Sequence, residues 1–145
     1  MKKLFVLTLI AGLFTTLTSS AQDDKSKRVS PPATAKETLA SGAAVTIDYS
    51  QPSVKGRKIG ADIAPYGKVW RTGANEATVF ETSKDVKVEG KALAAGKYGL
   101  YTIPGEKEWT IIFNKTWKQW GTDYTEADDA LRVAVKPGKA ASATE

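Results

Sequence analysis

Hydrophobic and polar residues alternate one by one through much of the chain after residue 43. In the segment AVTIDYS, Val45, Ile47 and Tyr49 fall on one side of an extended chain, and Thr46 and Asp48 fall on the other. Successive side chains of a β-strand point to opposite faces, so a period of two is typical of a strand with one buried face. The pattern therefore predicts a half-buried strand over residues 44–50.

Further strands are predicted by segments rich in β-branched and aromatic residues: 68–72 (KVWRT), 76–82 (EATVFET), 85–93 (DVKVEGKAL), 96–103 (GKYGLYTI), 108–115 (EWTIIFNK) and 130–136 (ALRVAVK). Turn residues separate them. The pair Pro104-Gly105 predicts a hairpin between residues 96–103 and 108–115, and Gly90 predicts a turn within residues 85–93. Residues 70–78 are predicted as a strand, a tight polar turn and a strand.

The spacing of these segments indicates the fold class. Short strands follow one another with Gly and Pro between them, and no segment longer than a turn or two has helical periodicity. This organisation favours an all-β domain, an antiparallel β-sandwich, with a partly open barrel as the alternative. We expect a single domain over residues 39–136.

The two ends of the chain have a different character. Residues 1–21 combine Lys2 and Lys3 with a short apolar stretch and small residues before Gln22, which predicts a cleaved signal peptide; an uncleaved N-terminal anchor is the alternative. No Cys follows, which excludes a lipoprotein anchor. Residues 22–38 are charged and contain Pro31-Pro32, so we expect a flexible lead-in, and residues 137–145 are expected to form a frayed tail.

Composition narrows the possible chemistry. The 145 residues include no Cys and no His, which excludes disulfides, thiol nucleophiles, Ser-His-Asp triads and His-based metal sites. Removal of residues 1–21 would leave 124 residues with 19 basic and 16 acidic side chains, a net charge of +3. Because the basic residues are scattered, no nucleic-acid-binding face is expected.

The stretch WRTGANEAT holds the first group of candidate site residues. Trp70, Arg71, Asn75 and Glu76 would bring an aromatic wall, a guanidinium fork, an amide and a carboxylate together, a set that suits a sugar hydroxyl, a carboxylate or a peptide backbone. The structural alternative is a core Trp70 beside a turn, with Arg71 paired to Glu76 or to a backbone carbonyl. In that case, Gly73 or Asn75 would adopt a positive φ.

Two other segments add candidates. In YSQPSVKGRK, Tyr49 and Arg57 accompany a basic turn, and in KTWKQWGTDY, Trp120 lies three residues after Trp117 in a segment without a clear strand pattern. Trp120 could serve as a ligand platform or cover the core. The acidic run DYTEADD could gather oxygen ligands for Ca²⁺, although it lacks the EF-hand pattern and an acidic solvated turn is expected instead.

Three stretches, VTIDYSQPSVKGRKI, PYGKVWRTGANEATVFETSKDVKVEGKALAAGKYGLYTIPGEKEWTIIFNK and QWG, resemble the bacterial family catalogued as domain of unknown function 2911. The similarity extends over roughly residues 39–136. It implies an exported β-rich domain of the kind found in Bacteroidetes-type bacteria, and it supplies no reaction. Similar members continue with more strands after residue 136, so the resemblance also implies a sheet that lacks C-terminal strands, as in a fragment or a shortened member.

These observations lead to a functional hypothesis. We expect a periplasmic or secreted, non-catalytic binding or structural module for a glycan, a peptide or an envelope component, with no cofactor, no bound metal and no transmembrane anchor after signal cleavage. The expected ligand-binding residues are Trp70, Arg71, Asn75, Glu76, Trp120, Tyr49 and Arg57. The alternative is a carboxylate-dependent periplasmic hydrolase or isomerase centred on Glu76, with Asp123, Asp128 or Asp129 as its second carboxylate.

Overall fold

The computed structural model of the chain describes residues 24–138. Its strands are β1 (Pro32–Thr38), β2 (Ala44–Ser50), β3 (Thr78–Thr82), β4 (Val86–Val88), β5 (Lys91–Leu93), β6 (Gly96–Ile103), β7 (Trp109–Asn114) and β8 (Asp129–Val135). Two short 3-10 helices, η1 (Lys25–Lys27) and η2 (Glu126–Asp128), accompany them. The predicted signal peptide (residues 1–21) and most of the expected tail (residues 139–145) lie outside the described residues.

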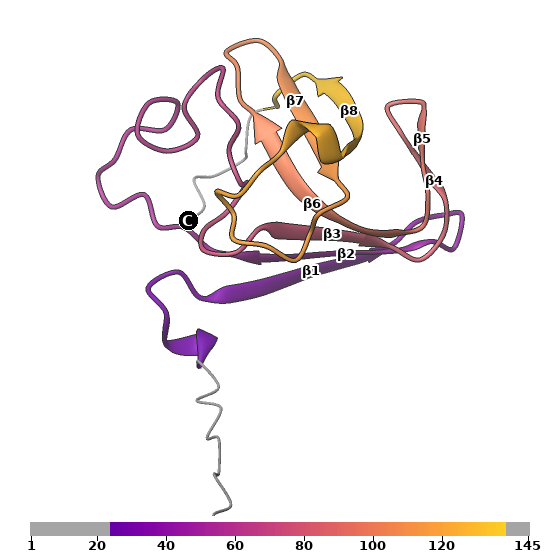
Figure 1. The fold of residues 1–145 in the computed structure, drawn as a ribbon, viewed down its shortest axis with the longest axis horizontal. Helices are drawn as coiled ribbons and strands as arrows, with labels where there is room; N and C mark the ends of the chain where they lie inside the picture. Colours follow the sequence, from indigo (N-terminus) through magenta and orange to yellow (C-terminus); the bar gives the residue numbers. More distant parts are fainter. Residues whose placement is uncertain (1–23, 139–145) are drawn as a thin grey trace, which may run out of the picture.

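The strands form an antiparallel all-β fold, as the sequence predicts. Six strands make one sheet in the order β1-β2-β3-β6-β7-β8, and β4 and β5 form a separate two-stranded sheet. The large sheet bends, so that β6, β7 and β8 rise away from the layer formed by β1, β2 and β3 (Figure 1). Because β1 and β8 are its two edges, the sheet is not a closed barrel.

The core lies on both faces of β6 and β7. On one face, Tyr98, Phe113 and Val133 pack with Leu93 of the β4–β5 hairpin. Tyr101 and Ile112, both fully buried, point to the opposite face and pack with Ala77. The alternation of side chains thus gives two clusters, which confirms a sandwich-like arrangement in place of a sheet with one solvent face.

Both hairpins predicted from turn residues are confirmed. β6 pairs with β7 from Ile103 opposite Thr110 onward, around the turn that contains Pro104-Gly105. β4 pairs with β5 around Glu89 and Gly90, which both have positive φ, 47° and 76°. Two successive residues in this conformation are typical of the tight hairpin turns whose twist matches that of the strands.

The lead-in expected over residues 22–38 differs from the structure in its second half. Residues Pro32–Thr38 form β1, which pairs along its whole length with β2, from Pro32 opposite Ser50 to Thr38 opposite Ala44. Nearly all of its side chains are exposed. β1 is an edge strand held by backbone hydrogen bonds, so it lacks the hydrophobic alternation by which a strand is recognised in sequence. The strand begins at a Pro, a position where the missing N–H is tolerated.

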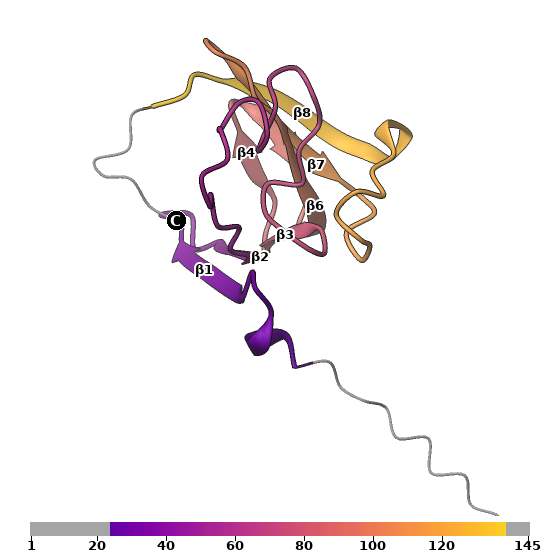
Figure 2. The ribbon, with the colours of Figure 1, turned by 90° about the vertical axis from the view of Figure 1, so that its left-hand side faces the viewer.

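Residues 70–78 do not form the predicted hairpin. Trp70 exchanges two backbone hydrogen bonds with Thr102 of β6, at 2.7 and 2.9 Å, and β3 pairs with the same strand starting at Thr78 opposite Leu100. Trp70 and β3 therefore lie end to end along one side of β6, and the residues between them leave the sheet. We call residues 71–77 the excursion. The longer connection that contains it, residues 51–77, lies at the left of Figure 1 and faces the viewer in Figure 2, away from the β4–β5 hairpin.

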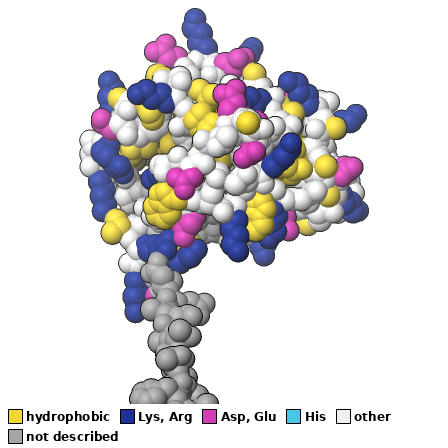
Figure 3. Space-filling model, viewed as in Figure 1, with side chains coloured by type: hydrophobic (Ala, Val, Ile, Leu, Met, Phe, Trp, Pro, Cys, Tyr) yellow, Lys and Arg dark blue, Asp and Glu magenta, His cyan; other side chains and the backbone are white. Residues whose placement is uncertain are grey.

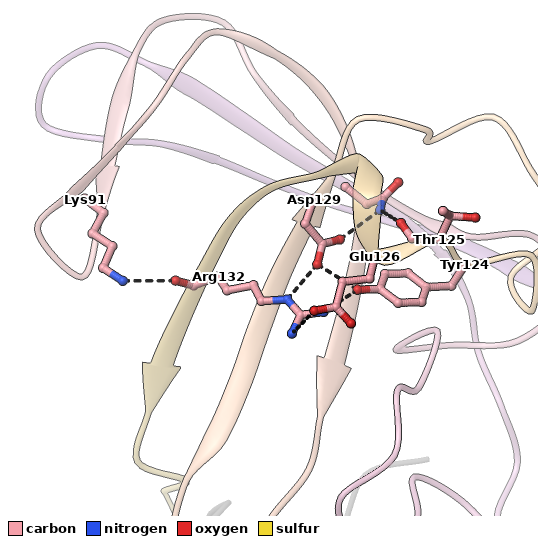
Figure 4. A network of polar contacts seen from close by, with 7 residues as sticks. Lys91, Tyr124, Thr125, Glu126, Asp129 and Arg132 are labelled. Atoms are coloured by element: carbon pink, nitrogen blue, oxygen red, sulfur yellow. Dashed lines mark hydrogen bonds and ion pairs between the residues drawn. The ribbon is translucent and has the colours of Figure 1, made fainter.

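A polar network fixes the segment before β8 to the sheet (Figure 4). The Asp129 carboxylate accepts hydrogen bonds from the Tyr124 hydroxyl at 2.7 Å, from Arg132 Nε at 2.6 Å and from the buried Asn114 amide at 2.9 Å. Arg132 also pairs with Glu126 at 3.2 Å. Burial, together with the hydrogen bond donated to Asp129, raises the pKa of Tyr124 to about 12. Tyr124, Asp129 and Arg132 therefore bind one another within the fold.

The charged side chains on the face drawn in Figure 3 are of both signs and are mixed over the surface. This mixture agrees with the scattering of basic residues along the sequence and differs from the single-sign face that nucleic-acid binding requires. No helix within residues 24–138 has the length and apolar character needed to cross a bilayer.

Candidate functional site

Two adjoining cavities lie in the connection between β2 and β3. The first has a volume of about 380 Å³ and a mostly apolar lining of Tyr49, Gln51, Pro52, Val54, Ile59, Ile63, Ala64, Trp70 and Trp109. We call it the apolar cavity. Three of the lining residues are aromatic. Tyr49 lies on β2, Trp70 pairs with Thr102 near the end of β6, and Trp109 is the first residue of β7. The strands thus place these aromatic walls, and the connection supplies the aliphatic ones.

The second cavity has a volume of about 330 Å³ and a more polar lining of Ser30, Pro52, Arg57, Asp62, Ile63, Ala64, Pro65, Trp70, Arg71, Gly73, Ala74 and Asn75. We call it the polar cavity. It shares Pro52, Ile63, Ala64 and Trp70 with the apolar cavity. Trp70 therefore lies between the apolar cavity, with its aromatic walls, and the polar cavity, which contains two arginines.

Arg71 is positioned by its own excursion. Its Nε donates to the Gly73 carbonyl at 3.3 Å, while Nη1 and Nη2 have no protein partner within residues 24–138. The aliphatic part of Arg71 lies across Gly121, where an added Cβ would overlap Arg71 Cδ and lie 2.8 Å from the Asn75 carbonyl oxygen. Gly121 thus gives the guanidinium stem the space that it occupies.

Arg57 is held by backbone oxygens in a similar way. Its Nη2 donates to the Ser53 carbonyl at 2.6 Å and its Nε to the Val54 carbonyl at 3.2 Å. The acidic residue of this cavity, Asp62, accepts a hydrogen bond from the Lys58 backbone N–H at 2.8 Å. Both guanidinium groups therefore have fixed orientations while keeping donors available, and the carboxylate is already engaged.

The backbone around the cavities has strained conformations. Ala64, Thr72 and Asn75 have positive φ values of 50°, 54° and 59°, and for a β-branched Thr this is a true outlier. The sequence predicts a positive φ at Gly73 or Asn75, and Asn75 is the residue that adopts it. A glycine is needed at position 73 for lack of space, since an added Cβ would lie 2.7 Å from Thr78 Oγ1. Strain of this kind persists only where the surroundings fix the backbone, and it is concentrated at ligand sites in proteins.

The structure brings together five of the seven residues that the sequence predicts for the site. Trp70 lines both cavities, Tyr49 lines the apolar one, and Arg57, Arg71 and Asn75 line the polar one. Glu76 and Trp120 are not among the residues lining either cavity. They pair with each other through their backbones instead, and Trp120 is 48% exposed.

Glu76 has other partners than Arg71. Arg28 Nη1 donates to both of its carboxylate oxygens, at 2.9 and 2.8 Å, and Lys25 Nζ lies 2.9 Å from Oε1. Burial alone would raise the pKa of this carboxyl, but the hydrogen bonds with Lys25 and Arg28 outweigh it and lower the pKa to about 2. Together with the hydrogen bond from Asn75 to the Ser30 carbonyl, at 3.2 Å, these pairs tie the N-terminal segment to the excursion.

The Glu76 ion pairs should contribute stability that depends on pH. Because the folded pKa of about 2 is below the ordinary value of 4.5, this contribution is complete above pH 4.5 and is lost as the pH falls toward 2. The Glu76 side chain is 36% exposed, so solvent screening limits the effect. We expect Glu76→Gln to lower the free energy of unfolding by about 1 kcal/mol at pH 7.

Urea unfolding at several pH values would measure this contribution. The difference between wild type and Glu76→Gln should shrink from pH 5 to pH 2, and Arg28→Gln should reproduce part of it, because Arg28 Nη1 donates to both carboxylate oxygens while Lys25 keeps its own contact with Oε1. A difference that stays constant across this range would contradict the assignment.

The carboxylates considered for catalysis or Ca²⁺ binding have structural partners. Asp129 belongs to the network with Arg132, and Asp128 accepts a hydrogen bond from Thr116 Oγ1 at 2.9 Å. Within residues 24–138, no three acidic side chains lie close enough together to hold a metal ion. Glu76, with a pKa of about 2, is a weak general base. A hydrolase or isomerase centred on Glu76 stays the alternative hypothesis.

Sequence reasoning missed the aliphatic half of the site. Val54, Ile59 and Ile63 line the apolar cavity from a connection with no periodic pattern, and Ile59 is 61% exposed. It also missed Arg28, which reaches Glu76 from a position 48 residues earlier. The only signal for the aliphatic walls was the density of apolar residues between Gly and Pro in residues 52–66, which does not distinguish a cavity wall from a core segment.

The chain belongs to the family described as "Protein of unknown function (DUF2911)", whose model matches residues 30–145. The matched region contains the whole six-stranded sheet, both cavities and the excursion. Neither the curated proteins nor the solved structures include a match to the chain. Family membership supplies no reaction or ligand.

Proposed function

We propose that this member of the DUF2911 family is an exported, non-catalytic binding module, and that its ligand occupies the joined apolar and polar cavities. One observation carries the proposal: five residues chosen from sequence for their ligand-binding chemistry line two cavities that share Trp70. Binding sites are typically concave and mostly apolar, with a few polar groups that orient the ligand. Cavities of about 380 and 330 Å³ fall within the usual size range of such sites.

The fixed backbone of the site supports binding over a purely structural role. The positive φ values of Ala64, Thr72 and Asn75 cost free energy that an ordinary connection between strands would avoid. Walls that are already in place reduce the ordering cost of binding. Export is supported by the composition of residues 1–21. N-terminal sequencing of protein recovered from the periplasm or medium would test it, and an intact Met1 would contradict it.

The binding role can be tested by NMR with isotope-labelled protein and a defined panel: simple disaccharides, blocked amino acids of each chemical class, and indole. We expect at least one member to shift the amides of residues 49–75 in a saturable manner. Trp70→Leu should weaken this binding about tenfold or more, since the residue contacts both chambers.

Trp120→Leu is the matched control, because Trp120 is exposed and outside both cavities. Thermal unfolding of each variant would verify that it is folded. A panel that shifts no amide of residues 49–75, or equal effects of the two substitutions, would overturn the proposal.

A further inference from the structure

The charge and shape of the two cavities define a ligand class, provided that the proposed binding function holds. We infer that the site accepts an aromatic carboxylate, with its ring in the apolar cavity and its anionic group in the polar cavity. The inference rests on three features: the groups that line each chamber, the donors that remain available, and the position of Trp70 between the chambers.

The polar cavity favours an anion over a cation or a neutral group. Its lining holds two guanidinium groups, Arg57 and Arg71, and a single carboxylate, Asp62, which already accepts a hydrogen bond from the Lys58 backbone N–H. The other carboxylate of the excursion, Glu76, is outside the lining and is bound by Arg28 and Lys25. The site therefore has an excess of positive charge that nothing within the described residues neutralises.

The available donors have the geometry for a carboxylate. Arg71 uses only Nε for the Gly73 carbonyl, which leaves Nη1 and Nη2, and Arg57 uses Nε and Nη2, which leaves Nη1. A guanidinium that presents two terminal N–H groups can bind both oxygens of a carboxylate at once. Since backbone carbonyls hold both side chains, their orientation is set before a ligand arrives.

The apolar cavity favours an aromatic group. Tyr49, Trp70 and Trp109 provide three aromatic walls, and Val54 and Ile63 complete them. Aromatic rings pack on one another in offset or edge-on arrangements that add to the effect of burial. Because Trp70 also lines the polar cavity, a ring in the first chamber and a carboxylate in the second need only a short linker between them.

Isothermal titration calorimetry with matched probes tests this inference. N-acetyl-L-tryptophan carries a carboxylate, and N-acetyl-L-tryptophanamide is its neutral counterpart of nearly the same shape. Hydrogen bonds to charged partners are stronger than neutral ones, so we expect the acid to bind wild-type protein about tenfold or more tightly than the amide. Octanoate should bind more weakly than N-acetyl-L-tryptophan, because it lacks the aromatic ring.

Arg71→Gln should remove most of the preference for the acid and leave the affinity for the amide nearly unchanged. The control is Lys87→Gln, which removes the same charge from an exposed position on β4, on the other side of the molecule. The Lys87→Gln variant should keep the preference for the acid over the amide. A thermal melt of each variant would confirm folding, and Arg57→Gln gives a second, independent variant from the same cavity.

The outcomes separate this inference from the binding function itself. Equal affinity for acid and amide, or a preference unaffected by Arg71→Gln and Arg57→Gln, would overturn the anionic class and leave a binding module with a neutral ligand. Tighter binding of octanoate would overturn the aromatic part. Binding of none of these probes, while another member of the NMR panel binds in the cavities, would overturn the ligand class alone.

Discussion

Phe113→Ala should lower the free energy of unfolding by about 3–5 kcal/mol, the usual cost of deleting a buried aromatic ring. Phe113 is 3% exposed and lies in the middle of the core face covered by the β4–β5 hairpin. Its ring makes edge-on contacts with Phe80 and Tyr98, with centroids 5.0 and 6.3 Å away. Because whole domains have stabilities of only about 5–15 kcal/mol, the loss would be a large fraction of the total.

Urea unfolding followed by circular dichroism would measure this loss. Phe113→Leu is the matched control: it keeps most of the buried apolar volume, and we expect it to cost less than half as much as Phe113→Ala. Both variants leave the cavities unchanged in composition. A loss below about 1 kcal/mol for Phe113→Ala would mean that the hairpin does not cover this face in solution.

Asp129→Ala should lower the free energy of unfolding by about 2–3 kcal/mol, because several donors lose an acceptor at once. The Asp129 side chain is 10% exposed and accepts hydrogen bonds from Tyr124, Arg132 and Asn114. Arg132 is 34% exposed and keeps its pair with Glu126. The remaining charge is therefore partly compensated, and the loss should be smaller than for Phe113→Ala.

Alkaline titration provides a second measurement on the same network. The pKa of Tyr124 is raised to about 12, so the stability linked to this phenol is complete below its ordinary value near 10 and is lost as the pH rises through 12. We expect the absorbance change of tyrosine ionisation above pH 11 to be smaller in Tyr124→Phe. If Tyr124→Phe left the titration above pH 11 unchanged and Asp129→Ala cost less than about 0.5 kcal/mol, the network would be excluded as a structural element.

The parts of the fold that the sequence predicts are those governed by local rules. Pro104-Gly105 and Gly90 identify two hairpins, because tight turns require particular residues. The alternation at Val45, Ile47 and Tyr49 identifies β2, where all three residues are partly buried. By contrast, β1 is an exposed edge held through the backbone, and its Thr, Lys and Glu residues give no periodic signal.

The types of side chain in the site could be predicted from the sequence, but the contacts that position them could not. Arg71 and Asn75 are recognisable as polar groups beside Trp70, whatever their conformation. Trp70, however, pairs with Thr102 rather than with its sequence neighbours, and Glu76 pairs with Arg28. Such contacts between distant parts of the chain depend on the topology of the whole sheet, which the local pattern does not contain.

The position of Trp70 between the two chambers also makes it an optical reporter. An indole changes its emission wavelength when polar or apolar groups replace the water around it, and a ligand in either cavity would change that environment. The chain has four tryptophans, so replacing Trp117 and Trp120, which line neither cavity, by phenylalanine would leave emission from Trp70 and Trp109, both of which line the site. Such a protein would reveal occupancy of the site by unlabelled compounds that do not themselves fluoresce in the tryptophan range, octanoate among them.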